Sequence, residues 1–293
     1  MATDRVPEPT STRSLTPGTA RATLLNILGD LTFPDEAPVP TTAFIQLMGK
    51  VGYTEPAVRQ AISRCAAARW ITGERHGRTT SWSLTAGGQQ LVGDGITRVE
   101  SLAAERSEWD GQWLVLVVSI PQQLRSGRDR LYRALRFDGF GNPSPAIWLS
   151  PHLDRYRRTA AALESLGLQD VALSFRGRPD VLGMRPCDLV AKGWDMDGLA
   201  EVYRTCCRRF AAMSPKIAED HAIALLHLDS ELQQFQVTDP QLPAALLPDW
   251  GGRHDAAVLL ACRQRWRPAA REYWRATVEA CESVHRQTVS ITS

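Results

Sequence analysis

Residues 54–84 read TEPAVRQAISRCAAARWITGERHGRTTSWSL, and this stretch decides the fold of the N-terminal part of the chain. Thr54 is a good helix N-cap, and Glu55 and Pro56 suit the first turn that follows it. Apolar residues then recur at positions i, i+4 and i+7, which predicts a helix with one buried face. The residues of that face are Val58, Ile62 and Cys65.

The opposite face of the predicted helix is polar and basic. Its side chains are Arg59, Gln60, Ser63 and Arg64. Such side chains hydrogen-bond base edges in a major groove or hold phosphates. Residues 70–72 and 80–84 then predict two strands around a tight turn at residues 74–78, where Arg75 and Arg78 flank Gly77. A helix followed by such a hairpin is the sequence pattern of a winged helix-turn-helix.

The residues upstream supply the two other helices of such a unit. Residues 19–31 predict a first helix, Thr41 can cap a second helix, and Gly52 allows the sharp turn before the third. Between residues 50 and 80, six basic and two acidic residues give a net charge of +4, against +2 for the whole chain. This local basic excess favours DNA binding. The alternative is a winged helix that makes only protein contacts, with a solvated charged face.

Composition places the chain among ordinary soluble proteins. It has 293 residues, of which 43% are hydrophobic and 23% charged, enough for two or three domains. No apolar run reaches the ~18 residues of a membrane span. Residues 1–18 are rich in Pro, Thr and Ser, so we expect a disordered tail and no secretory signal. None of the six cysteines forms a CxxC pair, so we expect reduced core cysteines in a cytoplasmic protein.

The middle of the chain predicts alternating strands and helices. The expected elements are a buried strand at 113–120, a helix at 125–137, a turn-rich loop at 139–143, a strand at 146–150, a helix at 153–166 and a strand at 171–175. The order βαβαβ indicates a ferredoxin-like α+β domain. Before it, Thr85 can cap a glycine-weakened helix, which we interpret as a connector over residues 86–108.

The last part of the chain predicts several amphipathic helices. They cover residues 198–213, capped by Asp197, residues 221–235, and residues 256–266 and 269–284, which Pro268 divides. The sequence therefore predicts an α+β multidomain protein. Its expected parts are the tail 1–18, a winged helix domain 19–85, the connector 86–108, a ferredoxin-like domain 109–180 and a helical domain 181–293.

The sequence carries no motif of a catalytic or cofactor site. It lacks a GxxxxGK[ST] phosphate loop, a dinucleotide fingerprint and a GxSxG nucleophile elbow. No histidine pair has metal-ligand spacing beside a Cys or Asp cluster. We therefore expect no catalytic residues, no metal and no cofactor, and no enzymatic activity. Arg176 and Arg178, after a predicted strand, can hold a phosphate-bearing ligand, although a solvated loop is the simpler interpretation.

Seven segments, taken in order, resemble the PaaX-type repressors of phenylacetic acid catabolism. They are LLNILGD (24–30), EPAVRQAISR (55–64), WDGQW (109–113), LRFDGFG (135–141), IWLSP (147–151), DPQLP (239–243) and LLPDW (246–250). The resemblance implies an N-terminal winged helix, a middle domain like the Cas2 ferredoxin-like fold and an α-helical C-terminal domain. The best-known member of the family is a dimeric repressor that phenylacetyl-CoA releases from DNA.

The resemblance therefore implies a cytoplasmic homodimer that represses a catabolic operon. Its partners would be double-stranded operator DNA and an aryl- or acyl-CoA effector. The expected DNA contacts are Thr54, Arg59, Gln60, Ser63, Arg64, Arg75 and Arg78. A CoA thioester needs cations at one end of a cleft and apolar lining at the other. The candidate cations are Arg176, Arg178 and Arg185.

Two other functions are open at this point. A Cas2-like nuclease needs a metal-binding aspartate at the end of its first strand, but here that strand ends VSIP (118–121), without a carboxylate. A metabolite-sensing module that does not bind DNA is the second alternative.

Overall fold

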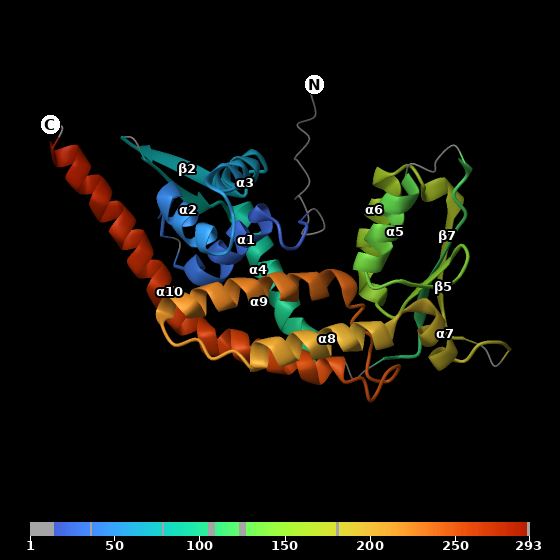
Figure 1. Ribbon diagram of the computed structural model, residues 1–293. Helices are drawn as coiled ribbons and strands as arrows, with labels where there is room; N and C mark the ends of the chain where they lie inside the picture. The colour runs from blue at the N-terminus through green and yellow to red at the C-terminus, as the bar shows by residue number, and fades with distance from the viewer. Residues whose placement is uncertain are drawn as a thin grey trace, which may run out of the picture. The chain divides into compact units, whose positions relative to one another are not determined.

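The computed structural model describes residues 15–35, 37–77, 79–104, 109–122, 127–179 and 182–291. These residues form a mixed α+β fold with helices α1 to α10 and two small sheets (Figure 1). They fall into two compact units. Unit 1 lies within Met1–Glu100, Phe210–Gln233 and Leu259–Ser293, and unit 2 lies within Ser101–Arg209 and Gln234–Val258. None of the described helices is long and apolar enough to cross a membrane.

Unit 1 begins with three helices. α1 (Ala20–Asn26) continues into a π-helical stretch (Ile27–Thr32), and α2 (Thr41–Lys50) and α3 (Glu55–Ala67) follow. Thr19 caps α1, because its hydroxyl accepts a hydrogen bond from the Ala22 amide over 3.3 Å. Gly52, with φ of +93°, makes the turn between α2 and α3.

Two of the predicted helix caps differ in the structure. Thr41 is the first residue of α2 and Pro40 holds the N-cap position, so the prediction that Thr41 caps this helix is wrong. The Thr41 hydroxyl donates instead to the Thr80 carbonyl over 3.0 Å. Thr54 occupies the N-cap position of α3, but its side chain makes no capping hydrogen bond to the described helix. A capping hydroxyl must stand at the N-cap position, one residue before the helix begins, and in α2 Pro40 occupies that position.

A three-stranded antiparallel sheet with the order β1-β3-β2 completes this part of unit 1. Its strands are β1 (Val39–Pro40), β2 (Ile71–His76) and β3 (Thr79–Leu84). β2 and β3 form the predicted hairpin, in which His76 pairs with Thr79. Arg78, between these two strands, lies outside the described residues.

α4 (Ala86–Glu100) follows the hairpin. Thr85 caps it as the sequence predicts, because the Thr85 hydroxyl accepts a hydrogen bond from the Gly88 amide over 3.1 Å. A 3-10 turn (Ser101–Ala103) follows, and residues 105–108 of the expected connector lie outside the described part. Leu91 and Val92 of α4 are buried in the core of unit 1.

Three long helices, α8 (Met196–Ala211), α9 (Ala218–Thr238) and α10 (Gly252–Ile291), form the later part of the chain. Asp195 accepts a hydrogen bond from the Gly198 amide over 2.9 Å at the start of α8, so the prediction that Asp197 is the cap is wrong by two residues. Asp197 already lies in the first turn of that helix, where acidic residues are favoured.

α10 runs unbroken through Pro268, whereas the sequence predicts two helices divided there. Proline removes one helical hydrogen bond and is therefore disfavoured in the interior of a helix. Residues on both sides of Pro268 are buried within unit 1, and such burial offsets the cost of the proline. They are Trp266, Ala270 and Trp274.

One hydrophobic core joins the N-terminal helices to segments far along the chain. Phe44 of α2 is fully buried, and its ring centroid lies 5.7 Å from that of Trp274 in α10. Leu225 and Leu226 of α9 belong to the same core. Unit 1 therefore folds from three separate parts of the sequence.

The cysteines divide between core and surface. Cys65, Cys206 and Cys262 are buried, as expected. Cys187 is exposed and Cys207 is partly exposed, so the prediction of six core cysteines is wrong for these two, which fall outside the buried faces of their amphipathic helices. Cys281 is partly exposed but packs against the core of unit 1.

Unit 2 holds a four-stranded antiparallel sheet with the order β5-β6-β4-β7. The elements, in chain order, are β4 (Trp113–Val118), α5 (Arg128–Phe137), β5 (Gly141–Ser144), β6 (Ile147–Ser150), α6 (Tyr156–Ser165) and β7 (Ala172–Gly177). The sequence predicts only three of these strands, because β5 occupies the expected loop at 139–143. β5 is an edge strand, where Pro143 is tolerated because its missing N–H is not needed by the sheet.

The two faces of this sheet are covered differently. α5 and α6 lie on one face (Figure 1), where Leu116 and Trp148 are buried with them in one core. On the other face, Trp113 and Leu149 pack with residues of α7 (Pro186–Gly193), a helix that the sequence reasoning did not anticipate. Phe175 of β7 stays half exposed on this second face.

Candidate nucleic-acid interface

The two faces of α3 divide as the sequence predicts. Val58, Ala61, Ile62 and Cys65 are buried in the core of unit 1. Thr54, Arg59, Gln60, Ser63 and Arg64 are exposed. Since the buried residues recur at helical spacing, the polar side chains of α3 share the outward side of the helix.

Contacts with α1 hold α3 in place. The hydroxyl of Tyr53, just before α3, donates to the Gly18 carbonyl over 2.8 Å and lies 3.1 Å from the Thr23 hydroxyl. At the other end of α3, the ring centroid of Trp70, just after the helix, lies 4.0 Å from the guanidinium of Arg21 in α1, at a cation–π distance. Both ends of α3 are therefore fixed against α1, which gives its exposed face a well-packed support.

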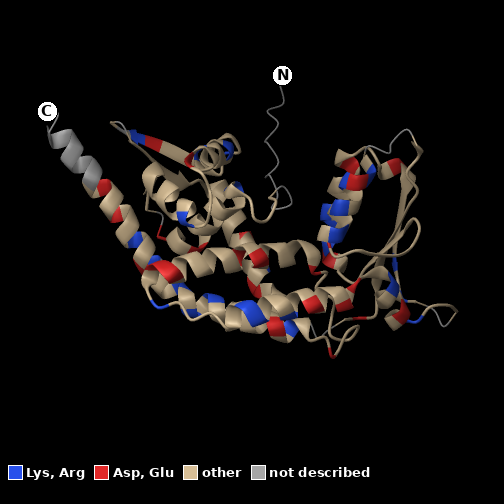
Figure 2. Cartoon of the chain, viewed as in Figure 1, with Lys and Arg blue, Asp and Glu red and all other residues tan. Residues whose placement is uncertain are grey.

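Ion pairs offset part of the positive charge counted in the sequence. Arg59 pairs with Glu55, one turn earlier, over 2.8 Å, and Lys50 pairs with Glu219 over 2.8 Å. The hydrogen bond to Glu219 raises the pKa of Lys50, and the same bond lowers the pKa of Glu219. Arg64 is exposed and has no ion-pair partner within the described residues. Figure 2 shows basic residues on α3 and near the outer end of β2.

The β2–β3 hairpin is tied to α2. The Trp82 indole donates to the Thr41 hydroxyl over 2.9 Å, and Thr41 donates in turn to the carbonyl of Thr80. Gly77 at the tip has φ of +59°, a conformation that favours glycine. Arg75 is exposed, and its Nε donates to the Gly77 carbonyl over 3.1 Å. The described part of the tip therefore presents the cation of Arg75 to solvent.

Gly88 lets α4 begin close against the segment that links α3 to β2. A Cβ atom at this position would lie 1.9 Å from the Trp70 carbonyl oxygen, so a larger residue does not fit without backbone movement. The Thr85 hydroxyl donates to the Arg69 carbonyl over 2.6 Å. α4 thereby fixes the place where the hairpin leaves α3.

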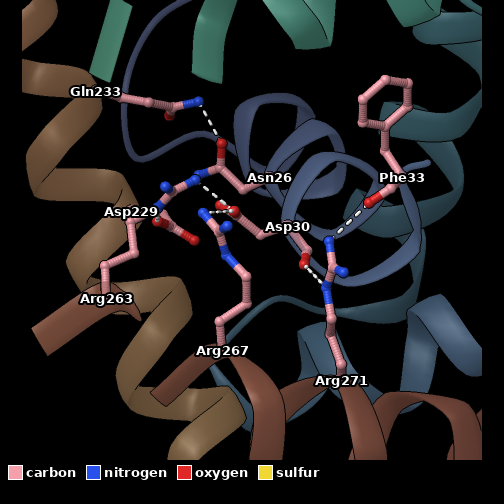
Figure 3. A network of polar contacts seen from close by, with 8 residues as sticks. All are labelled: Asn26, Asp30, Phe33, Asp229, Gln233, Arg263, Arg267 and Arg271. Carbon is pink, nitrogen blue, oxygen red and sulfur yellow. Dashed lines mark hydrogen bonds and ion pairs between the residues drawn. The ribbon is translucent and has the colours of Figure 1, made fainter. Parts of the chain in front are cut away.

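A buried network of charges joins the π-helical stretch to α9 and α10 (Figure 3). The Asp30 carboxylate accepts a hydrogen bond from Arg263 and lies 3.0 Å from Nη2 of Arg267. Arg263 also donates from Nε to Oδ1 of Asp229 over 2.9 Å. Burial, together with the nearby charge of Asp30, raises the pKa of Asp229 well above its ordinary value.

Two further contacts extend this network. Arg271 donates to the carbonyls of Asp30 and Phe33, each over 2.7 Å, and the Gln233 amide donates to the side chain of Asn26. The two bonds from Arg271 satisfy backbone carbonyls at the end of the π-helical stretch, which lack partners within the helix. Sequence reasoning missed the network. The signal was the spacing of Arg263, Arg267 and Arg271, which places three cations on one face of α10.

The three candidate effector cations lie in unit 2, and each contacts a different neighbour. The Arg176 guanidinium lies 5.0 Å from the ring centroid of Tyr156 in α6. Arg185 makes two hydrogen bonds to the Asp188 carboxylate, over 3.0 and 3.2 Å. Arg178 follows β7 and lies beside Gly111. Within the described residues, no group of three or more His, Cys, Asp or Glu side chains could hold a metal ion.

Three family models match the chain in succession. A model described as PaaX-like protein matches residues 19–88, PaaX protein central Cas2-like domain matches residues 106–187, and PaaX-like protein C-terminal domain matches residues 194–276. The chain belongs to the PaaX family. Its order of domains is thus that of the three models.

Two known proteins are similar to this PaaX-family chain over most of its length. The protein named transcriptional repressor PaaX, from Escherichia coli (strain K12), is 27% identical over 240 residues, which are 76% of this chain and 73% of that protein. A solved structure of an uncharacterized protein from Mycobacterium tuberculosis is 25% identical, with a TM-score of 0.56. That match covers 88% of this chain and 98% of the other.

Segments that resemble the PaaX family meet inside unit 2. The Nε2 atom of His152, just after the IWLSP segment, lies 2.8 Å from the Pro240 carbonyl oxygen of the DPQLP segment. Arg155 donates to the Asp138 carbonyl of the LRFDGFG segment over 3.0 Å and to Gln241 over 3.2 Å. These motifs therefore hold the helical region against the sheet within unit 2.

Proposed function

We propose that this PaaX-family chain is a DNA-binding transcriptional repressor in which α3 reads operator DNA. The similarity to a protein named a transcriptional repressor supports the repressor role. The observation that carries the DNA-reading role is the outward face of α3, with Arg59, Gln60, Ser63 and Arg64 exposed above a buried apolar face. Arginine and glutamine in this arrangement can hydrogen-bond base edges in a major groove.

The finer fold assignments belong to this proposal. We assign α1 to α3 and the β2–β3 hairpin to a winged helix-turn-helix, in which α3 is the recognition helix and the hairpin is the wing. We assign the sheet of unit 2 to a ferredoxin-like domain, supported by its βαββαβ order. The domain limits in this scheme are 19–85, 86–108, 109–180 and 181–293, after a tail of residues 1–18.

In the proposed mechanism the repressor acts as a cytoplasmic homodimer on a catabolic operon. Two copies of α3 enter successive major grooves of a pseudo-palindromic operator, with half-sites one helical turn or a multiple apart. An aryl- or acyl-CoA effector, with phenylacetyl-CoA the first to test, favours a dimer geometry that no longer matches this spacing. The effector must bind the DNA-free state more tightly, typically by ~1–3 kcal/mol.

The ion pair between Arg59 and Glu55 gives the two arginines of α3 different roles. Arg59 must exchange its contact with Glu55 for a contact with DNA, whereas Arg64 has no ion pair to break within the described residues. Arg64 therefore contributes more to the free energy of DNA binding. Arg59 adds selectivity, because a surface that does not contact Arg59 offers no compensation for its lost ion pair with Glu55.

Selection of binding sites from a random DNA library with the full chain tests the proposal. The selected site is then titrated, by fluorescence anisotropy, with the wild type, with the Arg59→Ala/Arg64→Ala double variant and with Arg204→Ala. Arg204 is an exposed arginine of α8, so its variant controls for loss of one positive charge. The double variant should bind at least ten-fold more weakly, because it removes two contacts and each lost base contact costs about 1–3 kcal/mol.

Three results contradict this proposal. Unchanged affinity in the double variant would show that α3 is not the recognition helix. An equal loss in Arg204→Ala would show a general charge effect. Failure to select any preferred sequence would favour the alternative of a metabolite-sensing module that does not bind DNA.

A further inference from the structure

The second face of the unit 2 sheet is hollowed into a groove of about 230 Å³. Its lining is almost entirely apolar and comes from all four strands, β4 to β7, and the region of α7. The apolar lining includes Val115, Ile147, Leu149, Phe175, Met184 and Leu189. A concave apolar surface of this kind suits the apolar part of a small molecule.

Arg178 is the one charged side chain among the described residues that line the groove. Its side chain lies beside Gly111, where an added Cβ atom would be 3.4 Å from the Arg178 Nε. No carboxylate pairs with Arg178 within the described residues. The nearby carboxylate of Asp110 already accepts hydrogen bonds from the backbone and side chain of Gln112, over 2.9 and 2.8 Å. The groove therefore combines an apolar body with one available cation.

We infer that this groove binds an aryl group or a short acyl chain whose anionic end is held by Arg178. A cavity of about 150 Å³ is enough to hold benzene, so the groove has room for a phenyl ring and a short linker. Pockets that enclose a whole drug-sized ligand are larger, about 300–1,000 Å³. A nucleotide portion, if the ligand carries one, must therefore remain outside the groove.

The anion can come from two sources that share this chemistry. Arginine binds the carboxylate of a free aryl or acyl acid through two parallel hydrogen bonds, and it binds a phosphate in the same way. In a CoA thioester the acyl end carries no charge and the phosphates lie at the far end of the pantetheine arm, so Arg178 holds a phosphate only where that arm folds back to the rim of the groove. That such a ligand is the effector rests on the proposed function. The binding itself does not depend on DNA and can be measured without it.

The other two candidate arginines, Arg176 and Arg185, are not placed to hold a ligand in this groove. Arg176 is paired across the sheet with Leu114, whose side chain faces α5 and α6, so Arg176 lies on the face away from the groove. Arg185 is bound to Asp188. Of the three arginines suggested by the sequence, Arg178 is therefore the one placed to hold a ligand in the groove.

A second copy of the chain fits this surface less well. Leu173 and Phe175 are exposed on it, so it is apolar enough for a protein contact. A two-fold contact, however, brings the same surface of both copies together, and the described lining of this groove holds no carboxylate to pair with Arg178 of a second copy. Charge complementarity therefore favours an anionic small molecule.

Calorimetric titration of the full chain, without DNA, tests the inference. The probes are phenylacetyl-CoA, phenylacetate and CoA alone. Phe175→Ala and Arg178→Gln alter the groove, and Leu173→Ala and Arg176→Gln are matched controls, because these neighbours on β7 do not line it. We expect the thioester or the free acid to bind the wild type. Both groove variants should then weaken binding at least ten-fold, with less than a two-fold change in either control.

The other outcomes overturn the inference. Unchanged affinity in the groove variants would place the ligand elsewhere, and absence of binding by both acyl probes would exclude this ligand class. If CoA alone binds as tightly as the thioester, the apolar groove has no role. If Phe175→Ala and Leu173→Ala both dissociate a dimer in sedimentation velocity while no probe binds, the surface is a contact between copies. Operator affinity is measured separately, so failure of DNA binding contradicts the proposed function and leaves these results interpretable.

Discussion

Arg263 of α10 donates a hydrogen bond to Asp229 of α9 over 2.9 Å, and both side chains are almost completely buried (Figure 3). The same guanidinium bonds Asp30 in the π-helical stretch after α1. One arginine therefore links three segments that are far apart in the sequence. Such a buried cluster is costly to break, because removal of one partner leaves charges without compensation.

Replacement of Arg263 by Ala should destabilise the protein strongly. Asp30 and Asp229 would lose their shared donor inside the core, at a cost of about 3–5 kcal/mol. Urea denaturation followed by circular dichroism measures this loss. Lys50→Ala is the control, because it removes a solvent-exposed ion pair with Glu219 and should cost little. Equal midpoints for both variants would show that the cluster adds nothing to stability.

Replacement of Asp229 by Asn tests the direction of its pKa shift. Since burial raises the pKa of Asp229 in the folded protein, the folded chain holds this proton more tightly than the unfolded chain. The contribution of Asp229 to the free energy of unfolding should therefore decrease as pH rises from 3.8 through the raised pKa. Urea titrations over this range should show the wild type losing stability relative to Asp229→Asn. A slope of the opposite sign would mean that Arg263 dominates and lowers that pKa.

Two glycines of α4 should respond in opposite directions to alanine. Gly88→Ala should destabilise the protein, because the new Cβ would meet the Trp70 carbonyl oxygen at 1.9 Å. Gly93→Ala meets nothing within 4 Å and should stabilise it by about 0.5–1 kcal/mol, as alanine favours helices. Thermal unfolding of both variants measures the difference. A stabilising Gly88→Ala would show that α4 does not press against the start of the hairpin.

Arg75 at the hairpin tip should contribute a phosphate contact. Arg75→Ala should weaken binding to the selected operator and to unrelated DNA by similar factors, and should reduce the log–log salt slope by about one unit. Anisotropy titrations at several salt concentrations give both numbers. Arg204→Ala should leave the slope unchanged. The same slope in Arg75→Ala and wild type would remove the described tip from the DNA interface.

Burial should protect Cys65 from alkylation. Burial raises the pKa of its thiol to about 11, so at pH 8 only about one thiol in a thousand is the reactive thiolate. Cys187 is exposed and should react first with iodoacetamide in the native protein. Peptide mass spectrometry after timed labelling compares the two. Equal labelling rates under native conditions would contradict the burial of α3 against the core.

Local patterns in the sequence were enough to define the parts of the candidate DNA interface. The apolar spacing of Val58, Ile62 and Cys65 fixed the inward face of α3, and so also the exposed face that carries Arg59 and Arg64. The cap at Thr85 and the turn at Gly77 also follow from nearby residues. These features were predictable because helix periodicity, capping and turn conformation depend on residues only a few positions apart.

Only the tertiary structure decided the features that depend on distant partners. β5 forms because its neighbour β6 offers a sheet edge, although its own sequence favours a turn. α10 continues through Pro268, with the buried aromatic residues Trp266 and Trp274 on either side of it. Arg263 meets Asp30, and Arg178 meets an apolar groove, through packing between segments that no local pattern connects. The sequence by itself determined which faces are apolar and which are basic; burial in the fold determined which charges meet and which remain available.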